Sequence, residues 1–129
     1  MLLRHGETEW SANGRHTGRT DIELTDTGRE QAKSTATALA ELQLRDPVVI
    51  SSPRRRALVT AELAGLNIDE VTPMLSEWDY GDYEGLTPTQ IRELAPDWTV
   101  WTQPCPGGES PAAATVRADQ AIALALQHM

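Results

Sequence analysis

Arg4, His5 and Gly6 follow one another near the start of the chain, and together they could carry out phosphoryl chemistry. The imidazole of a histidine can attack phosphorus and form a phosphohistidine, which divides one difficult displacement into two easier ones. An arginine beside it would neutralise the phosphoryl oxygens during the transfer. A glycine leaves room for a ligand to approach the backbone. Because three residues alone are weak support, the interpretation depends on matching residues elsewhere in the chain.

Further segments of the chain supply such residues. They are Ser51-Ser52-Pro53-Arg54-Arg55-Arg56-Ala57 with Thr60-Ala61, the acidic and aromatic stretch Glu77-Trp78-Asp79-Tyr80-Gly81-Asp82-Tyr83-Glu84-Gly85, and Gly108-Glu109-Ser110. In this order, together with the opening run, they resemble the histidine phosphatase superfamily, the phosphoglycerate mutase-like group, in its phosphatase branch. The resemblance covers residues 2 to about 126.

The resemblance implies the catalytic roles. His5 would be the phosphorylated nucleophile, and Arg4 would bind the phosphoryl group beside it. Arg56 would bind the same group from one turn inside its helix, where the helix dipole also favours an anion. Glu77 would protonate the oxygen of the leaving group.

A loop after the nucleophile matches the substrate loop of the family. Thr17 and Gly18 fall within it, and the resemblance implies that both contact the substrate. Ser11 stands where the mutases of the family place an asparagine, so its contact with phosphate would be made by a shorter side chain. His16 lies in the same loop, and we expect it to pack within the loop or at the rim of the site.

Other charged residues near these motifs are expected to be solvated. Arg54 and Arg55 do not match the catalytic arginine of the family, which predicts that they lie at the surface. Asp79 and Glu84 are likewise expected to belong to a solvated loop.

A metal site is a competing interpretation of the first residues. Its candidate ligands would be His5, Glu7, Glu9, His16 and Asp21. Their spacing matches no metal-binding pattern, such as two histidines one helical turn apart. We therefore expect no metal and no other cofactor.

Alternating strand and helix patterns predict an α/β fold in which helices cover both faces of a mostly parallel sheet, a three-layer α/β/α sandwich. Short apolar or β-branched runs predict strands at residues 1–3, 47–51 and 70–74. Spacing and capping residues predict helices at residues 26–42, 52–64, 88–94, 97–102 and 110–129, with loops at 10–25 and 76–85. Trp98 and Trp101 are expected in the core.

No strand follows the last predicted helix, although a helix of a parallel layered fold usually leads to another strand. The family carries a second catalytic histidine at the end of such a strand, and His128 cannot replace it because it lies on the helix itself. We therefore expect residues 1–129 to be the N-terminal portion of a single domain that lacks the C-terminal strand and the second-histidine motif.

Composition limits the partners. The net charge of -8 argues against binding to nucleic acid or to anionic lipid. No apolar run approaches the roughly 20 residues of a membrane span, and Cys105 is the only cysteine, which excludes an internal disulfide. We expect a cytoplasmic protein that acts on a small phosphorylated substrate. Exposed sheet edges in an incomplete domain would favour a homo-oligomer.

The resemblance leaves three functions open. The favoured function is metal-independent hydrolysis of small phosphomonoesters through phosphohistidine on His5. The first alternative is a phosphoglycerate mutase that uses a bisphosphoglycerate primer, and the second is a non-catalytic binding domain. The short segment Leu86 to Gly107 favours hydrolysis, since the mutases carry a longer insertion there that encloses the substrate.

Overall fold

The computed structural model describes residues 1–129. Its elements are α1 (Glu9–Ala12), α2 (Asp26–Glu41), β1 (Ile50–Ser51), α3 (Arg55–Leu63), β2 (Glu70–Val71), the 3-10 helices η1 (Pro73–Leu75) and η2 (Gly81–Tyr83), α4 (Pro88–Leu94) and α5 (Pro111–Leu126). β1 and β2 form a parallel pair with Ile50 opposite Glu70 and Ser51 opposite Val71.

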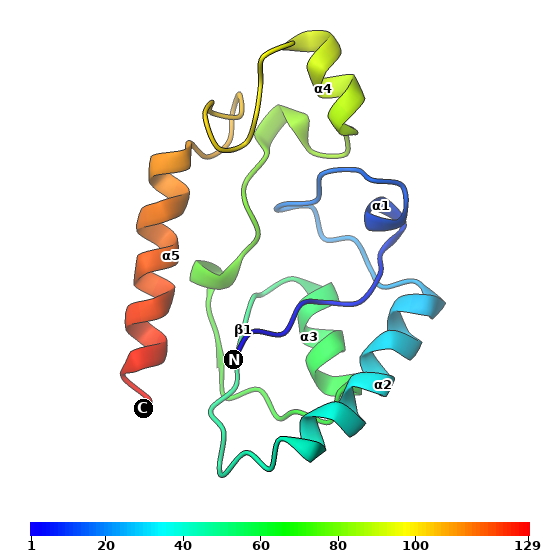
Figure 1. The fold of residues 1–129 in the computed structure, drawn as a ribbon, viewed down its shortest axis with the longest axis vertical. Helices are drawn as coiled ribbons and strands as arrows, with labels where there is room; N and C mark the ends of the chain where they lie inside the picture. Colours follow the sequence, from blue (N-terminus) through cyan, green and yellow to red (C-terminus); the bar gives the residue numbers. More distant parts are fainter.

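Helices flank this small sheet on two sides, as Figure 1 shows. α2 and α3 pack against each other on one side, and α5 lies on the other side, where it contacts η1. The N-terminal segment runs between these layers, and α4 with its neighbouring loops forms the upper end of the molecule. The predicted α/β class with a parallel sheet is confirmed, and the sheet has only these two paired strands.

The predicted strands are shorter than expected or missing. Residues 1–3 form no strand, and the side chains of Met1 and Leu2 are 77% and 94% exposed. A strand exists only through its hydrogen-bonded partners, and nothing pairs with this segment. Of the strand expected at 47–51, only β1 (Ile50–Ser51) is formed, because only these residues pair with a neighbouring strand. The strand expected at 70–74 ends at Val71, because Pro73 has no N–H for a ladder and starts η1 instead.

α3 begins later than predicted. Its first residue is Arg55, whereas Ser52 and Pro53 precede the helix. The hydroxyl of Ser52 accepts a hydrogen bond from the backbone N–H of Arg54, which forms a turn rather than a helix cap. The other end agrees with the prediction, since Gly65 follows the helix with a φ of +78°, a conformation suited to glycine.

Two further local predictions are wrong. The four-residue α1 lies partly in the segment expected to be loop, and Thr8 and Ser11 cap it through reciprocal hydrogen bonds. Residues 97–102 form turns and no helix. The N–H groups of Thr102 and Gln103 both donate to the carbonyl of Thr99, which makes a single turn that does not continue as a helix.

The remaining helices match the prediction closely. Thr25 caps α2 by accepting from the N–H of Gly28. Thr87 and Gln90 form a capping box at α4, and Ser110 caps α5. These signals are local and do not depend on packing partners. α5 ends at Leu126, three residues earlier than predicted, so His128 lies in the turn after the helix and not on the helix itself.

The hydrophobic core lies at the α4 end of the molecule. Its cluster of mutually packed side chains consists of Tyr83, Ile91, Trp98 and Cys105. Further buried hydrophobic residues lie outside this cluster: Leu24, Ala32, Ala61, Ala64 and Ala114. Trp98 is buried as predicted, but Trp101 is 76% exposed, which corrects the expectation that both tryptophans are core residues. None of the helices combines the length and the apolar composition that crossing a membrane would require.

Candidate active site

The backbone around His5 is held between α2 and α3. The N–H of Gly6 donates to the hydroxyl of Thr60 on α3 over 3.0 Å. On the other side, a Cβ on Gly6 would collide with the carbonyl of Gly28 in α2, and a Cβ on Gly28 would collide with the carbonyl of Glu7. Glycine is therefore required at both positions. The close approach of the two backbone segments that it permits fixes the position of the His5 backbone.

The ring of His5 is oriented by its own neighbour. Nδ1 lies 2.7 Å from the carbonyl oxygen of Gly6. A carbonyl can only accept, so Nδ1 carries the proton and donates. In the neutral ring, Nε2 then keeps the free lone pair.

The surroundings of His5 favour this neutral form. Burial is the main cause that lowers the pKa of the His5 imidazole below its usual 6.5. The hydrogen bond to Gly6 and the charge of Glu77 raise it, whereas the charges of Arg56 and Arg4 lower it further. The net pKa is lowered, so the ring is neutral at pH 7 and able to act as a nucleophile.

We expect the titration of His5 to reflect this balance. A histidine-selective NMR titration should give a midpoint below 6.5, because the lowered pKa keeps the ring neutral as the pH falls toward that value. In Arg4→Gln the midpoint of the His5 titration should rise, because one nearby positive charge is removed. Burial of the ring should still keep this midpoint below 6.5. A midpoint at or above 6.5 in the unaltered protein would contradict this description of the site.

Arg56 is almost completely buried, with 2% of its surface exposed. Its two terminal nitrogens donate to the carbonyls of Thr20 and Gly18, each over 2.7 Å. Burial lowers the pKa of Arg56, but an arginine remains charged at any physiological pH. The guanidinium therefore holds the substrate loop in place and brings a positive charge beside His5.

Glu84 holds the same loop from its other side. One carboxylate oxygen accepts from the N–H of Gly18 (3.0 Å), the N–H of Thr20 (2.8 Å) and the hydroxyl of Thr20 (2.8 Å). Burial raises the pKa of Glu84, but these hydrogen bonds outweigh it and leave the pKa lowered. The expectation of a solvated residue is therefore wrong for Glu84. It is also wrong for Asp79, whose side chain is 14% exposed and pairs with Arg19.

Arg4 and Glu77 are exposed to solvent. Glu77 accepts a hydrogen bond from the N–H of Trp78 over 2.8 Å. Its charge raises the pKa of both His5 and Arg56, which places the carboxylate within electrostatic reach of both residues.

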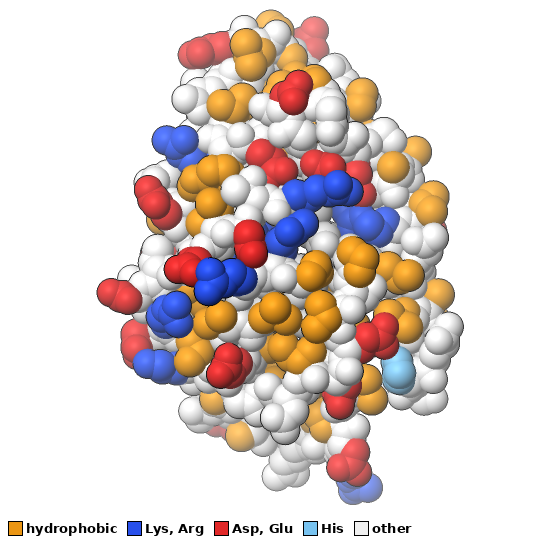
Figure 2. All heavy atoms as spheres, turned by 180° about the vertical axis from the view of Figure 1, so that it is seen from behind, with side chains coloured by type: hydrophobic (Ala, Val, Ile, Leu, Met, Phe, Trp, Pro, Cys, Tyr) orange, Lys and Arg blue, Asp and Glu red, His pale blue; other side chains and the backbone are white.

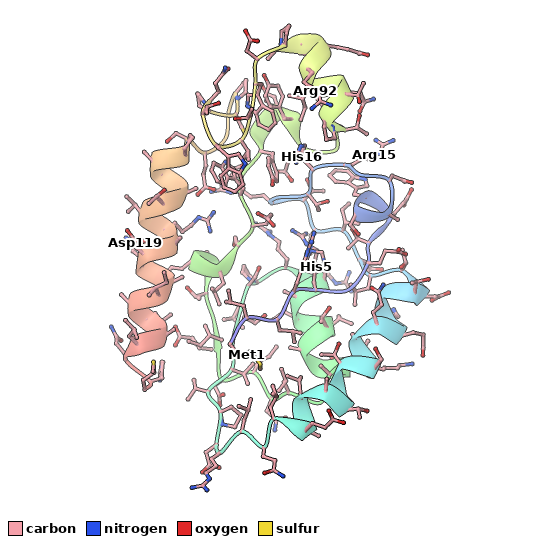
Figure 3. The ribbon with its side chains drawn as sticks, viewed as in Figure 1. Met1, His5, Arg15, His16, Arg92 and Asp119 are labelled. Carbon is pink, nitrogen blue, oxygen red and sulfur yellow. The ribbon has the colours of Figure 1, made fainter.

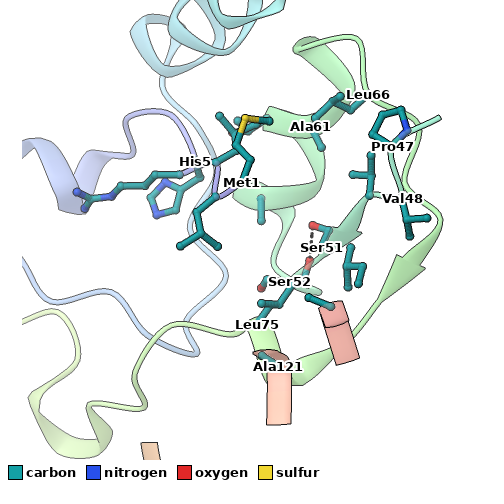
Figure 4. A pocket seen from close by; sticks show the side chains of 18 of the residues that line it. Met1, His5, Pro47, Val48, Ser51, Ser52, Ala61, Leu66, Leu75 and Ala121 are labelled. Carbon is teal, nitrogen blue, oxygen red and sulfur yellow. Dashed lines mark hydrogen bonds between the residues drawn. The ribbon is translucent and has the colours of Figure 1, made fainter. Parts of the chain in front are cut away.

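A cavity of about 680 Å³ brings the four predicted catalytic residues together. Arg4, His5, Arg56 and Glu77 all line it. Its other walls are largely apolar and come from the N-terminal segment, β1 and α5. Figure 3 shows His5 near the centre of the molecule, and Figure 4 shows the side chains that face one another across the cavity.

On the back of the molecule, hydrophobic side chains gather beside a group of charged ones (Figure 2).

The predicted substrate-contact residues are placed differently. Ser11 lines a second cavity of about 310 Å³ together with Arg4 and His5, and its hydroxyl also caps α1. Thr17 and Gly18 line neither of these two cavities. The N–H of Gly18 donates to Glu84, and its carbonyl accepts from Arg56. In this structure Gly18 therefore shapes the loop.

His16 packs in the loop, as expected. Its ring lies 4.5 Å from that of Tyr80 and 5.8 Å from that of Trp98, measured between centroids. Figure 3 shows it on the α4 side of His5. Burial lowers the pKa of His16, so this ring also favours the neutral form.

Arg54 was not anticipated from the sequence as part of the site. It is half-buried, lines the cavity with His5, and has a buried Nε without a hydrogen-bond partner. Arg55 is exposed as predicted, and it pairs with Glu23 over 2.6 Å. The adjacent arginines look alike in the sequence, and only the start of α3 determines which of them faces inward.

No group of three or more histidine, cysteine, aspartate or glutamate side chains is arranged to hold a metal ion. The positive charges of the site come instead from arginine guanidinium groups, which suit phosphate oxygens.

Comparison with known proteins gives a consistent picture. A sequence profile of the histidine phosphatase superfamily (branch 1) matches residues 1–129. An acid phosphatase of Mycobacterium tuberculosis is 65% identical over 129 residues, which is 100% of this chain and 64% of the relative. A sedoheptulose 1,7-bisphosphatase of Saccharomyces cerevisiae is 33% identical over 145 residues, covering 95% of this chain and 54% of the relative.

The fold comparison agrees. A solved structure of an open reading frame from Mycobacterium tuberculosis superposes with a TM-score of 0.95 at 65% sequence identity, over 98% of this chain and 66% of that one. The chain thus spans about two-thirds of the length of the most similar of these proteins.

Proposed function

Because the chain belongs to the histidine phosphatase superfamily (branch 1), we propose that it carries the nucleophile of a phosphatase that hydrolyses small phosphomonoesters. The observation that carries this proposal is the orientation of His5. Its Nδ1 donates to the Gly6 carbonyl, and the ring lines a cavity shared with three arginines, Arg4, Arg54 and Arg56, and with Glu77.

In the first step, Nε2 of His5 attacks the phosphorus atom. A P–N bond forms while the bond between phosphorus and the ester oxygen breaks, and that oxygen leaves with the electron pair. The carboxyl group of Glu77 donates a proton to the leaving oxygen, so the product is a neutral alcohol and Glu77 is left as a carboxylate. The phosphoryl group remains on His5.

Arg4 and Arg56 stabilise the charge on the transferring group. A guanidinium has five N–H donors, and two nitrogens of Arg56 are already engaged by the loop carbonyls. That engagement fixes the orientation of the guanidinium before substrate arrives, which is the condition for effective electrostatic stabilisation. Arg4 is exposed and lines the same cavity, so its guanidinium can contact the phosphoryl group as well.

In the second step, water attacks the phosphorus atom of the phosphohistidine. The Glu77 carboxylate accepts a proton from this water, the P–N bond breaks, and phosphate and neutral His5 are released. No metal takes part in the proposed steps.

Turnover in H₂¹⁸O tests this function in the protein that carries these residues. Hydrolysis through a phosphohistidine should place one ¹⁸O in each released phosphate and none in the alcohol, since the P–O bond of the ester is the one that breaks. Phosphoryl transfer that needs a bisphosphate primer and releases no labelled phosphate would indicate a mutase. Binding of phosphomonoesters without turnover would indicate a non-catalytic domain, and either result would overturn the proposal.

A further inference from the structure

Glu77 lies on a segment without regular structure, between η1 and η2. Its side chain is exposed, and its carboxylate is bonded to the N–H of the next residue, Trp78. A general acid must meet the leaving oxygen at hydrogen-bond distance. The position of Glu77 therefore depends on how the backbone around it is held.

Arg117 of α5 holds the backbone on the side that precedes Glu77. One of its terminal nitrogens donates to the carbonyl of Met74 over 3.0 Å and to the carbonyl of Ser76 at a shorter distance. The other terminal nitrogen lies 3.5 Å from the carbonyl of Glu77 itself. A single side chain thus contacts three carbonyls along this stretch.

Glu109 holds the backbone on the side that follows Glu77. Its carboxylate accepts from the N–H of Asp79 over 2.9 Å. Its backbone N–H donates to the carbonyl of Asp79 over 2.8 Å, and its carbonyl accepts from the indole of Trp78 over 3.4 Å.

Arg117 and Glu109 are joined to each other by a forked pair. Nε and one terminal nitrogen of Arg117 each lie 2.7 Å from a different carboxylate oxygen of Glu109. The side chains are only 23% and 15% exposed. The hydrogen bonds to Glu109 raise the pKa of Arg117, and the same bonds lower the pKa of Glu109. Bidentate pairs of this kind are strong and directional, and lysine cannot reproduce the fork.

We propose that Arg117, locked by Glu109, is a positioning residue that holds both flanks of Glu77 so that its carboxyl group meets the leaving oxygen. This inference rests on the proposed function, because it assumes that Glu77 is the general acid. It assigns to α5 a part in proton transfer, although Arg117 itself does not line the cavity of His5.

The test measures kcat/KM for Arg117→Lys and Arg117→Gln on esters with different leaving groups. Misplacing a catalytic group by a small distance can cost about 10²-fold. We therefore expect alkyl phosphates to lose at least about ten-fold more rate than 4-nitrophenyl phosphate, whose leaving group needs little protonation. Arg92→Gln serves as the control, because Arg92 is exposed on α4 and should show no such selectivity.

The outcomes separate the two proposals. Glu77→Gln, measured beside these variants, should show the same selectivity more strongly. If Glu77→Gln is selective but Arg117→Lys slows both ester classes equally, or slows neither, the positioning role is overturned and the proposed function stands. If Glu77→Gln is not selective, the general-acid assignment fails, and the positioning role fails with it. Arg117→Lys keeps the positive charge. If Arg117→Gln does not fold, the selectivity of Arg117→Lys between the two ester classes alone tests the positioning role.

Discussion

Replacing His5 by alanine is expected to reduce phosphomonoester hydrolysis by on the order of 10⁴- to 10⁶-fold, the range seen when a catalytic nucleophile is removed. The substitution deletes Nε2, the only protein atom that bonds to phosphorus in the proposed mechanism. It also deletes the hydrogen bond from Nδ1 to Gly6, a single contact on a segment that Thr60 continues to hold.

Steady-state rates and thermal unfolding of His5→Ala should be measured together. An unchanged Tm with abolished turnover is the expected pair of results, because the anchoring of this segment by α2 and α3 does not involve the ring. Activity within ten-fold of the unaltered protein would show that another group, or water itself, attacks phosphorus.

Glu77→Gln is expected to have the second largest effect, and one that depends on the substrate. General acid catalysis typically contributes about 10²- to 10⁴-fold, so alkyl phosphates should slow by that amount. Activated aryl phosphates should slow far less, because their leaving oxygen is stable without a proton.

Glu93→Gln is the matched control for Glu77→Gln, since it makes the same change at an exposed position of α4. It should leave both substrate classes at their original rates. Equal slowing of alkyl and aryl esters in Glu77→Gln would mean that Glu77 maintains the loop and does not transfer a proton.

The features that could be predicted from the sequence depend on local chemistry. The ends of α2, α4 and α5 follow from the caps Thr25, Thr87 and Ser110, each of which bonds to a backbone N–H within its own first turn. The choice of Arg4, His5, Arg56 and Glu77 as site residues follows from the resemblance to a family and not from periodicity. That residues 1–129 alone place all four around one cavity is a finding of the structure.

The features that could not be predicted depend on distant partners. The run Met1-Leu2-Leu3 is apolar, but no neighbouring strand pairs with it. Arg54 and Arg55 adjoin, yet only Arg54 lines the cavity. α3 begins at Arg55, three residues after the predicted start, so Arg54 precedes the helix and Arg55 is its first residue. Glu84 resembles any acidic loop residue until the chain brings Gly18 and Thr20 against it.

The orientation of His5 can be tested directly by trapping the intermediate. The protein is mixed with a phosphomonoester, quenched in alkali, digested, and the phosphorylated peptide is identified by mass spectrometry with standards for the two phosphohistidine isomers. We expect acid-labile phosphate on Nε2 of His5, because Nδ1 is occupied by the Gly6 carbonyl. Phosphate on Nδ1, phosphate on another residue, or label that persists in His5→Ala would contradict the proposed mechanism.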